Sequence, residues 1–299
     1  MRLSPIVLFV YNRLDHTIKT VESLQKNILA VDSELIVYSD AAKDRDIINQ
    51  VGKVRDYIKS INGFKKITII EREKNFGLAD SIIDGVTTIV NKFGKVIVLE
   101  DDLVTSPYFL SFMNEALEFY ENKRDVYSIT GFNYPLKITC DYMFGTYLYP
   151  RCSSKSWATW KNKWRKIEFN ENEIINKWNL SKIEFKIEPY GKDLYQMFKS
   201  QLNQEINSWA IRFAVNQIML EKYTVYPVKS HVKDIGLDSG THSNNSLPHK
   251  GVVSNKLIVD FATQYNDDFR KLYKKYLRAY FFKSRLHIVK NKIKFFFFG

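Results

Sequence analysis

Cysteine, glycine and proline are all scarce in this sequence of 299 residues. The two cysteines, Cys140 and Cys152, form no Cys-x-x-Cys pair, so we expect neither a disulfide scaffold nor a structural zinc site, and we expect a reducing compartment such as the cytoplasm. Only 12 glycines and 7 prolines occur, which excludes collagen-like and low-complexity architectures. No run of about 18 apolar residues is found, so the sequence predicts no transmembrane helix.

Acidic residues are absent from the last part of the chain. Residues 270–299 hold ten Lys or Arg and no Asp or Glu, whereas the whole chain has 45 basic and 33 acidic residues and a net charge of +12. The first 269 residues therefore carry a net charge of only +2, and we expect no nucleic-acid partner. The composition, 45% hydrophobic and 26% charged, is that of a globular protein.

Apolar runs and helical patterns alternate along the first 130 residues. The helical patterns, with apolar residues spaced three or four apart, lie within 47–61, 82–90 and 110–120. Buried strands are predicted at 5–11, 34–39, 66–71, 95–99 and 126–130. This alternation predicts an α/β fold with a mostly parallel, doubly wound sheet and right-handed crossovers.

The pattern is looser after residue 131. Three tryptophans, Trp157, Trp160 and Trp164, share one face of a predicted helix, and we expect core packing for them, with stacking on a sugar as the alternative. Residues 190–222 are predicted to be mostly helical, and a strand is predicted near 225–230. We expect one compact unit over 1–256 with halves at 1–130 and 131–256, an exposed loop at 236–251, and a helical tail over 257–299.

Polar residues follow each predicted strand at the point where it ends. Arg13 follows the first strand, Asp40 the second, Asn75 the third, and the acidic residues 100–102 the fourth. Because open α/β sheets bind ligands at the carboxyl ends of their strands, we expect these four sets to converge on one edge. The sequence therefore predicts a ligand site at this edge.

The acidic residues Glu100, Asp101 and Asp102 are the sharpest signal in the sequence. Three successive carboxylates after a buried strand repel one another, and a bound cation relieves that repulsion. Mg²⁺ and Mn²⁺ take oxygen ligands, often one or two carboxylates together with substrate phosphates. The alternative is a solvated acidic turn near a helix N-terminus. The sequence lacks the P-loop, GxGxxG, GxSxG and HExxH motifs, which disfavours several other enzyme classes.

An ordered set of motifs then makes the sequence familiar. It comprises FVYNR (9–13), YSDAAK (38–43), NFGLADSI (75–82), VLEDDLV (98–104), SWAIRF (208–213) and DIGLDSGTHS (234–243). Over roughly residues 1–245 the chain resembles GT-A-fold nucleotide-sugar glycosyltransferases, particularly N-acetylglucosaminyltransferase I-like enzymes and bacterial relatives in polysaccharide synthesis. The resemblance implies that 1–130 binds the nucleotide sugar and that 131–256 binds the acceptor.

The resemblance also implies roles for single residues at the donor site. Arg13 meets the nucleotide or diphosphate, Asp40 hydrogen-bonds the base, which we expect to be uracil, and Asn75 shapes the pocket. Glu100 and Asp101 contact sugar or ribose, and Asp102 ligates Mn²⁺ or Mg²⁺. The alternatives are a surface charge for Arg13, a turn cap for Asp40 and a simple turn around Asn75.

Further predicted roles fall on the second half of the chain. Arg212 is a candidate contact for the diphosphate or acceptor. His242 and His231 are candidates to contact the donor diphosphate or to add a metal ligand, with a structural role as the alternative for each. Trp209, like the other tryptophans, is a candidate for sugar stacking, with core packing as the expected role.

The catalytic base is where the sequence departs from the resemblance. An inverting enzyme needs a carboxylate to deprotonate the acceptor hydroxyl. Asn207 occupies the position where the relatives have an acid, and an amide cannot act as a base. Glu205 and Asp193 are the candidate replacements. A catalytically inactive, membrane-bound scaffold of the same fold therefore stays a rival interpretation, and a sugar nucleotidyltransferase is a second alternative.

The tail combines basic residues with an apolar helical spacing. The spaced residues are Leu272, Tyr276, Tyr280, Leu286, Val289, Ile293 and Phe297. Such a helix binds in the plane of an anionic bilayer, although it can instead pack on the catalytic domain. The sequence thus predicts a cytoplasmic glycosyltransferase at the inner face of the cell membrane. We expect it to be metal-dependent and inverting, and to move sugar from a UDP-linked donor to a glycan acceptor that is lipid-linked.

Overall fold

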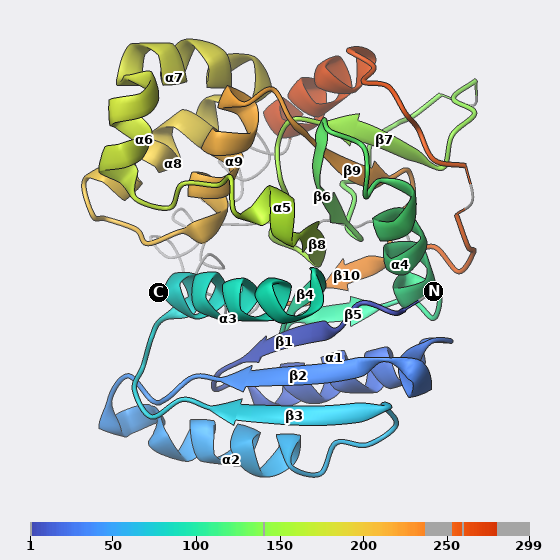
Figure 1. The fold of residues 1–299 in the computed structure, drawn as a ribbon, viewed down its shortest axis with the longest axis vertical. Coiled ribbons are helices and arrows are strands. Elements are labelled where there is room, and N and C mark those ends of the chain that lie inside the picture. Colours follow the sequence, from blue (N-terminus) through green and yellow to red (C-terminus); the bar gives the residue numbers. More distant parts are fainter. Residues whose placement is uncertain (1, 140, 237–252, 259, 280–299) are drawn as a thin grey trace, which may run out of the picture.

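The structure is a computed structural model that describes all residues except 1, 140, 237–252, 259 and 280–299. Its first part alternates strands and helices, as predicted (Figure 1). The elements are β1 (Ile6–Val10), α1 (Leu14–Gln25), β2 (Glu34–Ser39), α2 (Ile48–Ile58), β3 (Lys66–Glu71), α3 (Leu78–Phe93), β4 (Lys95–Glu100), β5 (Leu103–Thr105), α4 (Phe109–Phe119) and β6 (Val126–Thr130). All five strands predicted in this part are confirmed.

The second part adds strands to the same sheet and a group of helices beside it. Its elements are β7 (Thr146–Tyr149), β8 (Trp157–Trp160), α5 (Lys161–Trp164), α6 (Glu171–Trp178), α7 (Leu180–Ile187), α8 (Lys192–Leu202), α9 (Trp209–Met219), β9 (Tyr223–Pro227) and β10 (Val232–Asp234). The helical region predicted at 190–222 is thus two helices, α8 and α9. The segment 203–208 separates these two helices.

The main sheet has eight strands in the order β3-β2-β1-β4-β8-β6-β9-β7. Strands β3, β2, β1 and β4 are mutually parallel, and β6 is parallel to β9. Strand β8 runs antiparallel to both of its neighbours, and β7 runs antiparallel to β9. A separate two-stranded sheet pairs β10 with β5. The predicted α/β fold with a mostly parallel sheet is confirmed, and it fits a GT-A architecture.

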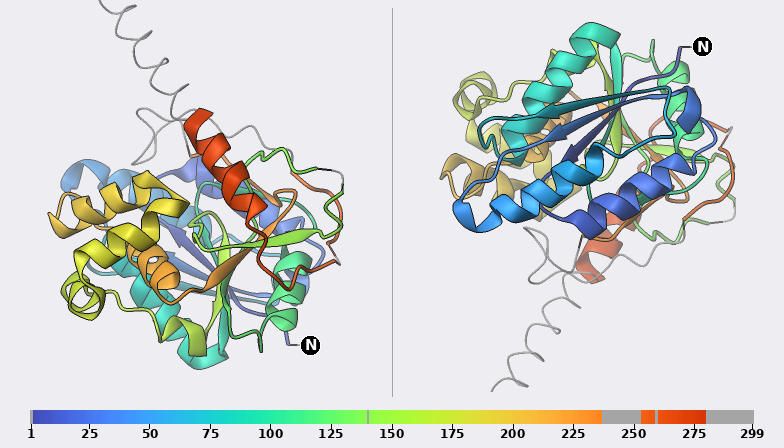
Figure 2. Two further views of the ribbon diagram at one scale, coloured as in Figure 1. Left: turned by 90° about the horizontal axis from the view of Figure 1, so that it is seen from above. Right: turned by 90° about the horizontal axis from the view of Figure 1, so that it is seen from below.

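Helices cover both faces of the sheet, which explains why β1 and the inner residues of β4 are completely buried. Helices α1, α2 and α4 pack on one face, and α3, α5 and α9 pack on the other. Figure 2 (right) shows the strands of the first half between α1 and α2 on one side and α3 on the other. Helices α6, α7 and α8 pack around α9 as a further layer (Figure 1).

The tryptophan segment corrects one prediction. Residues 157–160 form strand β8 rather than the expected helix, and only Trp164 lies on a helix. Because side chains alternate across a strand, Trp157 and Trp160 point to opposite faces of the sheet and belong to different core clusters. Trp157 stacks on Trp164 and Trp209 with ring centroids 5.6 and 4.5 Å apart. Core packing, the expected role of these tryptophans, is confirmed.

The C-terminal segment packs on the domain as far as the structure describes it. Residues 257–258 and 260–267 are not helical, contrary to the prediction, and helix begins at 268 and continues to 279. Phe269 stacks on Tyr147 at 3.9 Å, and Tyr273 stacks on Tyr149 at 4.0 Å. Residues 280–299, which carry most of the predicted membrane contact, lie outside the described residues. Across the described ranges, every helix is too short or too polar to cross a bilayer.

Candidate functional site

Arg13 and the acidic residues after β4 meet at the carboxyl edge of the sheet. Strand β1 pairs with β4, so Arg13, just beyond the end of β1, lies beside the end of β4. Its Nη2 atom donates hydrogen bonds to Oδ1 of Asp101 and to Oδ2 of Asp102, the latter at 2.8 Å. The predicted convergence of these two sets is therefore present in the structure.

Helix α1 fixes the backbone of this acidic turn. The hydroxyl of Thr20 donates to the carbonyl of Asp101 at 2.8 Å and accepts from the amide of Leu103 at 3.1 Å. Thr20 is completely buried, so these bonds are shielded from water. Helix α1 thus fixes the backbone of the turn between β4 and β5, and the carboxylates of this turn stay at the edge of the sheet.

Strand β10 closes the opposite side of the turn. The amide of Ile235 donates to the carbonyl of Asp102 at 2.9 Å, and Nε2 of His16 lies 3.2 Å from the carbonyl of Ile235. Gly236 follows, and a Cβ at this position would collide with Oδ2 of Asp102. Only a glycine lets the chain pass this close to the carboxylate without moving one of them.

Two charged residues without a predicted role, Lys155 and Asp234, complete the cluster. Their side chains form an ion pair, and the amide of Gly236 donates to the other oxygen of Asp234 at 2.8 Å. We call Glu100, Asp101, Asp102 and Asp234 the carboxylate cluster. Asp234 belongs to a motif that the resemblance quoted, but nothing in the sequence pairs it with Lys155.

Two members of the carboxylate cluster, Glu100 and Asp101, have raised pKa values. Burial, followed by the charges of Asp102 and Asp101, raises the pKa of Glu100 to about 8. Burial also raises the pKa of Asp101, although Arg13 opposes that shift. Burial lowers the pKa of Arg13, but the two aspartates outweigh it and the net pKa is raised. In the described part of the chain, three aspartates of the cluster form ion pairs with two cations: Arg13 pairs with Asp101 and Asp102, and Lys155 pairs with Asp234.

The donor set suits a hard divalent cation, but it is not a complete metal site by itself. Within the described ranges, no three His, Cys, Asp or Glu side chains are arranged to hold a metal ion. Carboxylate oxygens are nevertheless the ligands that Mg²⁺ and Mn²⁺ take, and these ions often bind through one or two carboxylates and substrate phosphates. Asp102, with 19% of its side chain exposed, fits such a role.

Asp40 and Asn75 lie together at the ends of β2 and β3, but they bond to each other and to the backbone. The Asp40 carboxylate accepts from the amides of Phe76 and Gly77, each at 2.9 Å, and from Nδ2 of Asn75 at 3.2 Å. Gly77 is the residue before α3, so Asp40 caps that helix from another segment. The structure shows the capping role, whereas the contact with a base stays a prediction.

Arg212 and Asn207 form a separate network at the start of α9. The guanidinium of Arg212 donates to Oδ1 of Asn207 at 2.8 Å, to the carbonyl of Phe169 at 3.0 Å and to Glu171 at 3.3 Å. Arg212 is only 7% exposed. Its interactions in the described part of the chain do not include the carboxylate cluster, so a role in donor binding stays a prediction.

The two candidate bases lie in different settings. Glu205 is exposed and accepts from Ser200 at 2.7 Å and from Asn203 at 3.2 Å, and these hydrogen bonds lower its pKa. Asp193, in the first turn of α8, is paired with Arg151 at 2.7 Å. Among the described residues, no ion pair or hydrogen bond connects either acid to the carboxylate cluster.

Of the two candidate histidines, His231 lies in the core, and His242 lies outside the residues that the structure describes. His231 is completely buried, its Nδ1 lies 2.9 Å from Oγ of Ser106, and its ring stacks on Phe112. Burial lowers its pKa to about 4, so it is neutral at pH 7. These contacts give His231 the structural role that was the alternative. His242 lies outside the described residues, and its metal role stays a prediction.

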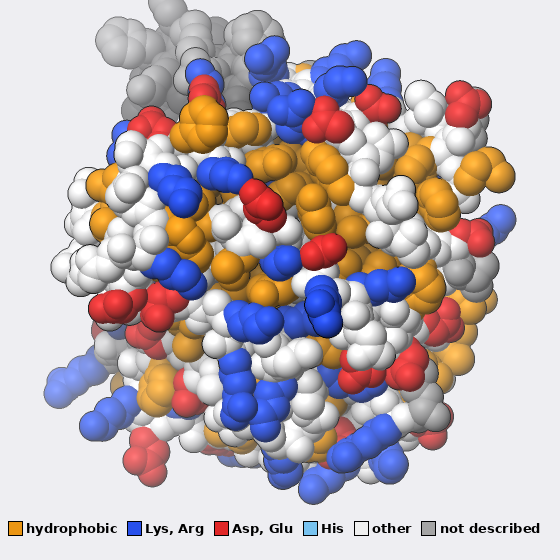
Figure 3. All heavy atoms as spheres, turned by 45° about the horizontal axis from the view of Figure 1, so that its top comes forward, with side chains coloured by type: hydrophobic (Ala, Val, Ile, Leu, Met, Phe, Trp, Pro, Cys, Tyr) orange, Lys and Arg blue, Asp and Glu red, His pale blue; other side chains and the backbone are white. Residues whose placement is uncertain are grey.

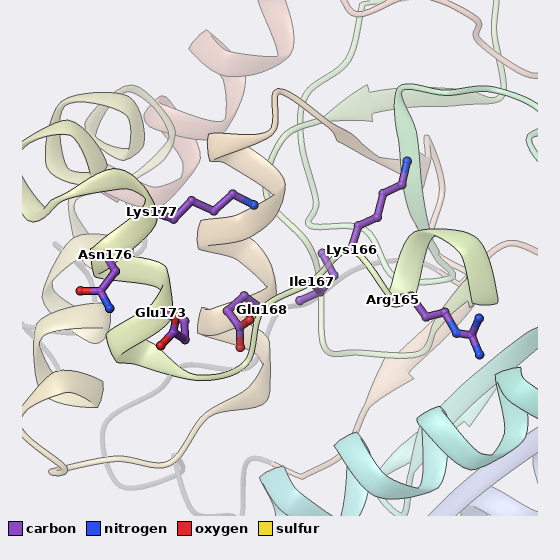
Figure 4. Close-up of a pocket in the computed structure, with 7 residues that line it drawn as sticks. All are labelled: Arg165, Lys166, Ile167, Glu168, Glu173, Asn176 and Lys177. Atoms are coloured by element: carbon purple, nitrogen blue, oxygen red, sulfur yellow. The ribbon is translucent and has the colours of Figure 1, made fainter.

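A surface pocket of about 400 Å³ lies elsewhere, beside α5 and α6 (Figure 4). Its lining includes Arg165, Glu168 and Lys177 and none of the predicted site residues. Lys and Arg side chains gather across the middle of the face shown in Figure 3, with Asp and Glu side chains beside them.

The part of the chain that carries the acidic turn and the strands around it also matches a family model. Residues 6–175 match the model of Glycosyl transferase family 2. The chain belongs to this family. The narrower resemblance to N-acetylglucosaminyltransferase I-like enzymes stays a prediction. No curated protein matches the sequence of this family 2 chain.

The solved structures to which the chain is similar include a mannosyltransferase and TarS. One is the mannosyltransferase PcManGT from Pyrobaculum calidifontis in complex with GDP-Man and Mn²⁺, with 13% identity, a TM-score of 0.37, and coverage of 58% of this chain and 46% of that one. The other is residues 1–349 of S. aureus TarS, with 13% identity, a TM-score of 0.41, and coverage of 78% and 60%. The family 2 chain thus spans less than two thirds of either structure.

Proposed function

We propose that this family 2 glycosyltransferase uses a UDP-linked sugar, requires Mn²⁺ or Mg²⁺, and inverts the anomeric centre. The observation that carries the proposal is the carboxylate cluster beside Arg13 at the carboxyl edge of the sheet. Asp102 would hold the ion, whose chemistry is to stabilise the negative charge of the departing diphosphate. Family membership favours glycosyl transfer over the alternative of nucleotidyl transfer.

Arg13 is suited to the diphosphate because one of its donors has no partner among the described residues. Nη2 binds the two aspartates, whereas Nη1 is buried and makes no hydrogen bond there. A buried donor without a partner costs free energy, and a phosphate oxygen would satisfy it. Glu100 and Asp101 would then contact the sugar or ribose, and the turn at Asn75 would border the base.

The transfer step needs one more carboxylate. The acceptor hydroxyl attacks the anomeric carbon, the bond from that carbon to the diphosphate breaks, and the hydroxyl proton goes to the base. Glu205 and Asp193 remain the proposed bases. The rival scaffold function is supported by Asn207, whose side-chain oxygen accepts from Arg212 and which has no acidic group.

The proposed acceptor is a glycan on a lipid, and the proposed location is the cytoplasmic face of the membrane. The basic sequence after residue 269 supports an anionic membrane surface as a partner, since each Lys or Arg near such a surface contributes about 1 kcal/mol. Residues 270–279 supply five of the ten basic side chains, so the remainder of this argument depends on sequence beyond the described residues.

Asp102→Ala tests the central assignment. We expect transfer to fall by roughly 100-fold or more, because the variant loses the proposed ligand of the ion that stabilises the leaving group. Binding of Mn²⁺ in the presence of UDP, followed by electron paramagnetic resonance, should weaken in parallel. The melting temperature should change little, because Arg13 keeps its bond to Asp101.

Asp125→Ala is the matched control, since Asp125 is an exposed aspartate paired with Lys222 at 3.0 Å. It should leave both transfer and Mn²⁺ binding unchanged. An Asp102→Ala variant that transfers sugar at the wild-type rate would refute the metal assignment. Absence of transfer by the wild-type chain from every nucleotide sugar tested would favour the scaffold interpretation.

A further inference from the structure

Lys155 is a half-buried cation in a place where no motif predicted one. It lies two residues before β8, its ammonium pairs with Asp234, and the ammonium is 4.8 Å from the centre of the Phe132 ring. Only 23% of its side chain is exposed, and only 11% of the side chain of Asp234. Lysine is rarely buried to this degree without a specific partner.

The backbone around Lys155 is held in an unusual conformation. Ser156 has φ of 51°, in the left-handed region that costs an ordinary residue roughly 1–2 kcal/mol. The hydroxyl of Thr130 donates to the carbonyls of both Lys155 and Ser156 at 3.0 Å, and the amide of Gly131 donates to the carbonyl of Ser156 at 3.0 Å. Such strain persists where surrounding contacts determine it, and it is common at functional sites.

This conformation directs Lys155 toward the acidic turn. Its partner Asp234 lies on β10, opposite Leu103 of β5 in the small sheet. Leu103 is the residue that follows Asp102 in the sequence. Ile235, the residue after Asp234, donates its amide to the carbonyl of Asp102. Burial lowers the pKa of Lys155, but Tyr134, Asp234 and Asp102 outweigh it and the net pKa is raised. Lys155 is therefore a charged member of the site.

The charges at the site indicate a role for Lys155 in stabilising a bound diphosphate. A nucleoside diphosphate brings negative charge to an edge that already holds the ion-paired aspartates Asp101, Asp102 and Asp234, and its charge grows as it leaves. Arg13 and Lys155 are the cations that the described part of the chain pairs with this cluster, and they approach it from different elements. Positive groups placed where negative charge develops stabilise the departing group.

We propose that Lys155 contacts the diphosphate of the nucleotide donor, and that Asp234 positions it there. This inference rests on the proposed function. It adds a second protein cation to Arg13 and assigns it to the leaving group rather than to the base or the sugar. The competing explanation is an ion pair that only stabilises the fold.

Calorimetric titration of the full chain with UDP and with uridine, both in the presence of Mn²⁺, separates these explanations. Lys155→Met should weaken UDP binding by about 10- to 100-fold, the loss expected for a hydrogen bond between charged groups. Uridine has no phosphate, so its affinity should be unchanged. Lys155→Arg keeps the charge and should stay within about threefold of wild type for UDP.

Lys177→Met is the matched control. Lys177 also lies over an aromatic ring, 4.5 Å from the centre of Trp178, but it is exposed and lines the separate pocket. It should leave UDP binding unchanged. Circular dichroism melting of each variant gives the effect on the fold independently of the ligand.

Equal UDP affinity of wild type and Lys155→Met would overturn the inference and leave the proposed function intact. An equal loss of UDP and uridine affinity, together with a lower melting temperature, would also overturn it, because it would show a structural ion pair only. If the wild-type chain does not bind UDP, the proposed function itself fails. Should Lys155→Met not fold, Lys155→Gln provides the same comparison.

Discussion

Asp40 provides the clearest test of how the donor side of the molecule is built. Helix α3 begins after Gly77, which has no side chain to cap it, and the carboxylate of Asp40 takes over this function from the end of β2. It accepts from the amides of Phe76 and Gly77 at 2.9 Å and from the amide of Ala41 at 3.0 Å. We therefore predict that Asp40 stabilises the fold in the absence of any nucleotide.

The expected magnitude follows from these bonds. A hydrogen bond to a charged group contributes about 1.5–3 kcal/mol, and loss of a helix cap costs up to about 2 kcal/mol. The amides of an open turn regain water, so we expect Asp40→Ala to lose about 3 kcal/mol in total. Asp40→Asn keeps one acceptor oxygen and should lose about 1 kcal/mol. For a domain of this size, 3 kcal/mol lowers the melting temperature by roughly 6 °C.

Urea unfolding followed by tryptophan fluorescence and by circular dichroism measures this loss. The control is Asp125→Ala, because Asp125 is an exposed aspartate whose carboxylate pairs with Lys222 at 3.0 Å. It should lose less than about 0.5 kcal/mol. If Asp40→Ala unfolds like the wild type but loses UDP affinity, Asp40 is a ligand residue and the capping argument is wrong.

Two glycines in helices and one histidine give further predictions. Gly52→Ala should raise the free energy of unfolding by about 0.5–1 kcal/mol, because nothing lies within 4 Å of the added methyl group. Gly85→Ala should lower the free energy of unfolding by about 1–2 kcal/mol, because the methyl group would lie 2.8 Å from the Phe9 ring. Equal effects of the two substitutions in urea titrations would contradict both glycine predictions. Burial lowers the pKa of His231 to about 4, so its contribution is complete above pH 6.5 and is lost as the pH falls toward 4. Wild type should therefore lose about 2 kcal/mol between pH 7.5 and 5 through this residue, and His231→Gln should lose correspondingly less in the same urea titrations.

The strands of the first half could be predicted from the sequence because they are buried on both faces. Strands β1 and β4 are continuous apolar runs, and such runs are recognisable without knowledge of their neighbours. Helix α1 was not predicted, and its buried face explains why. That face includes Thr17, Thr20 and Ser23 beside Val21 and Leu24, so polar residues interrupt its apolar spacing. The hydroxyl of Thr20 is used inside the protein, where it donates a hydrogen bond to the carbonyl of Asp101 in the acidic turn.

The acidic turn was predictable for a different reason. Residues at the carboxyl ends of parallel strands share an edge whatever the details of packing, so Arg13 and Asp102 could be placed together in advance. The task of Asp40 could not be assigned in the same way. Its partners Phe76 and Gly77 are 36 and 37 residues away, and their free amides exist only because α3 begins there. A strand-end aspartate looks the same in sequence whether it binds a ligand or a helix.

The part of the site that the sequence did not predict depends on where β8 enters the sheet. Strand β8 inserts between β4 and β6 and runs antiparallel to both, with Trp157 opposite Val98. That register places residue 155 next to the end of β4, at the same edge as the carboxylates. A tryptophan spacing of three is equally compatible with a helix, and a helix would have directed Lys155 elsewhere. The cation at the acidic turn is thus a consequence of strand pairing between distant segments, which local periodicity cannot determine.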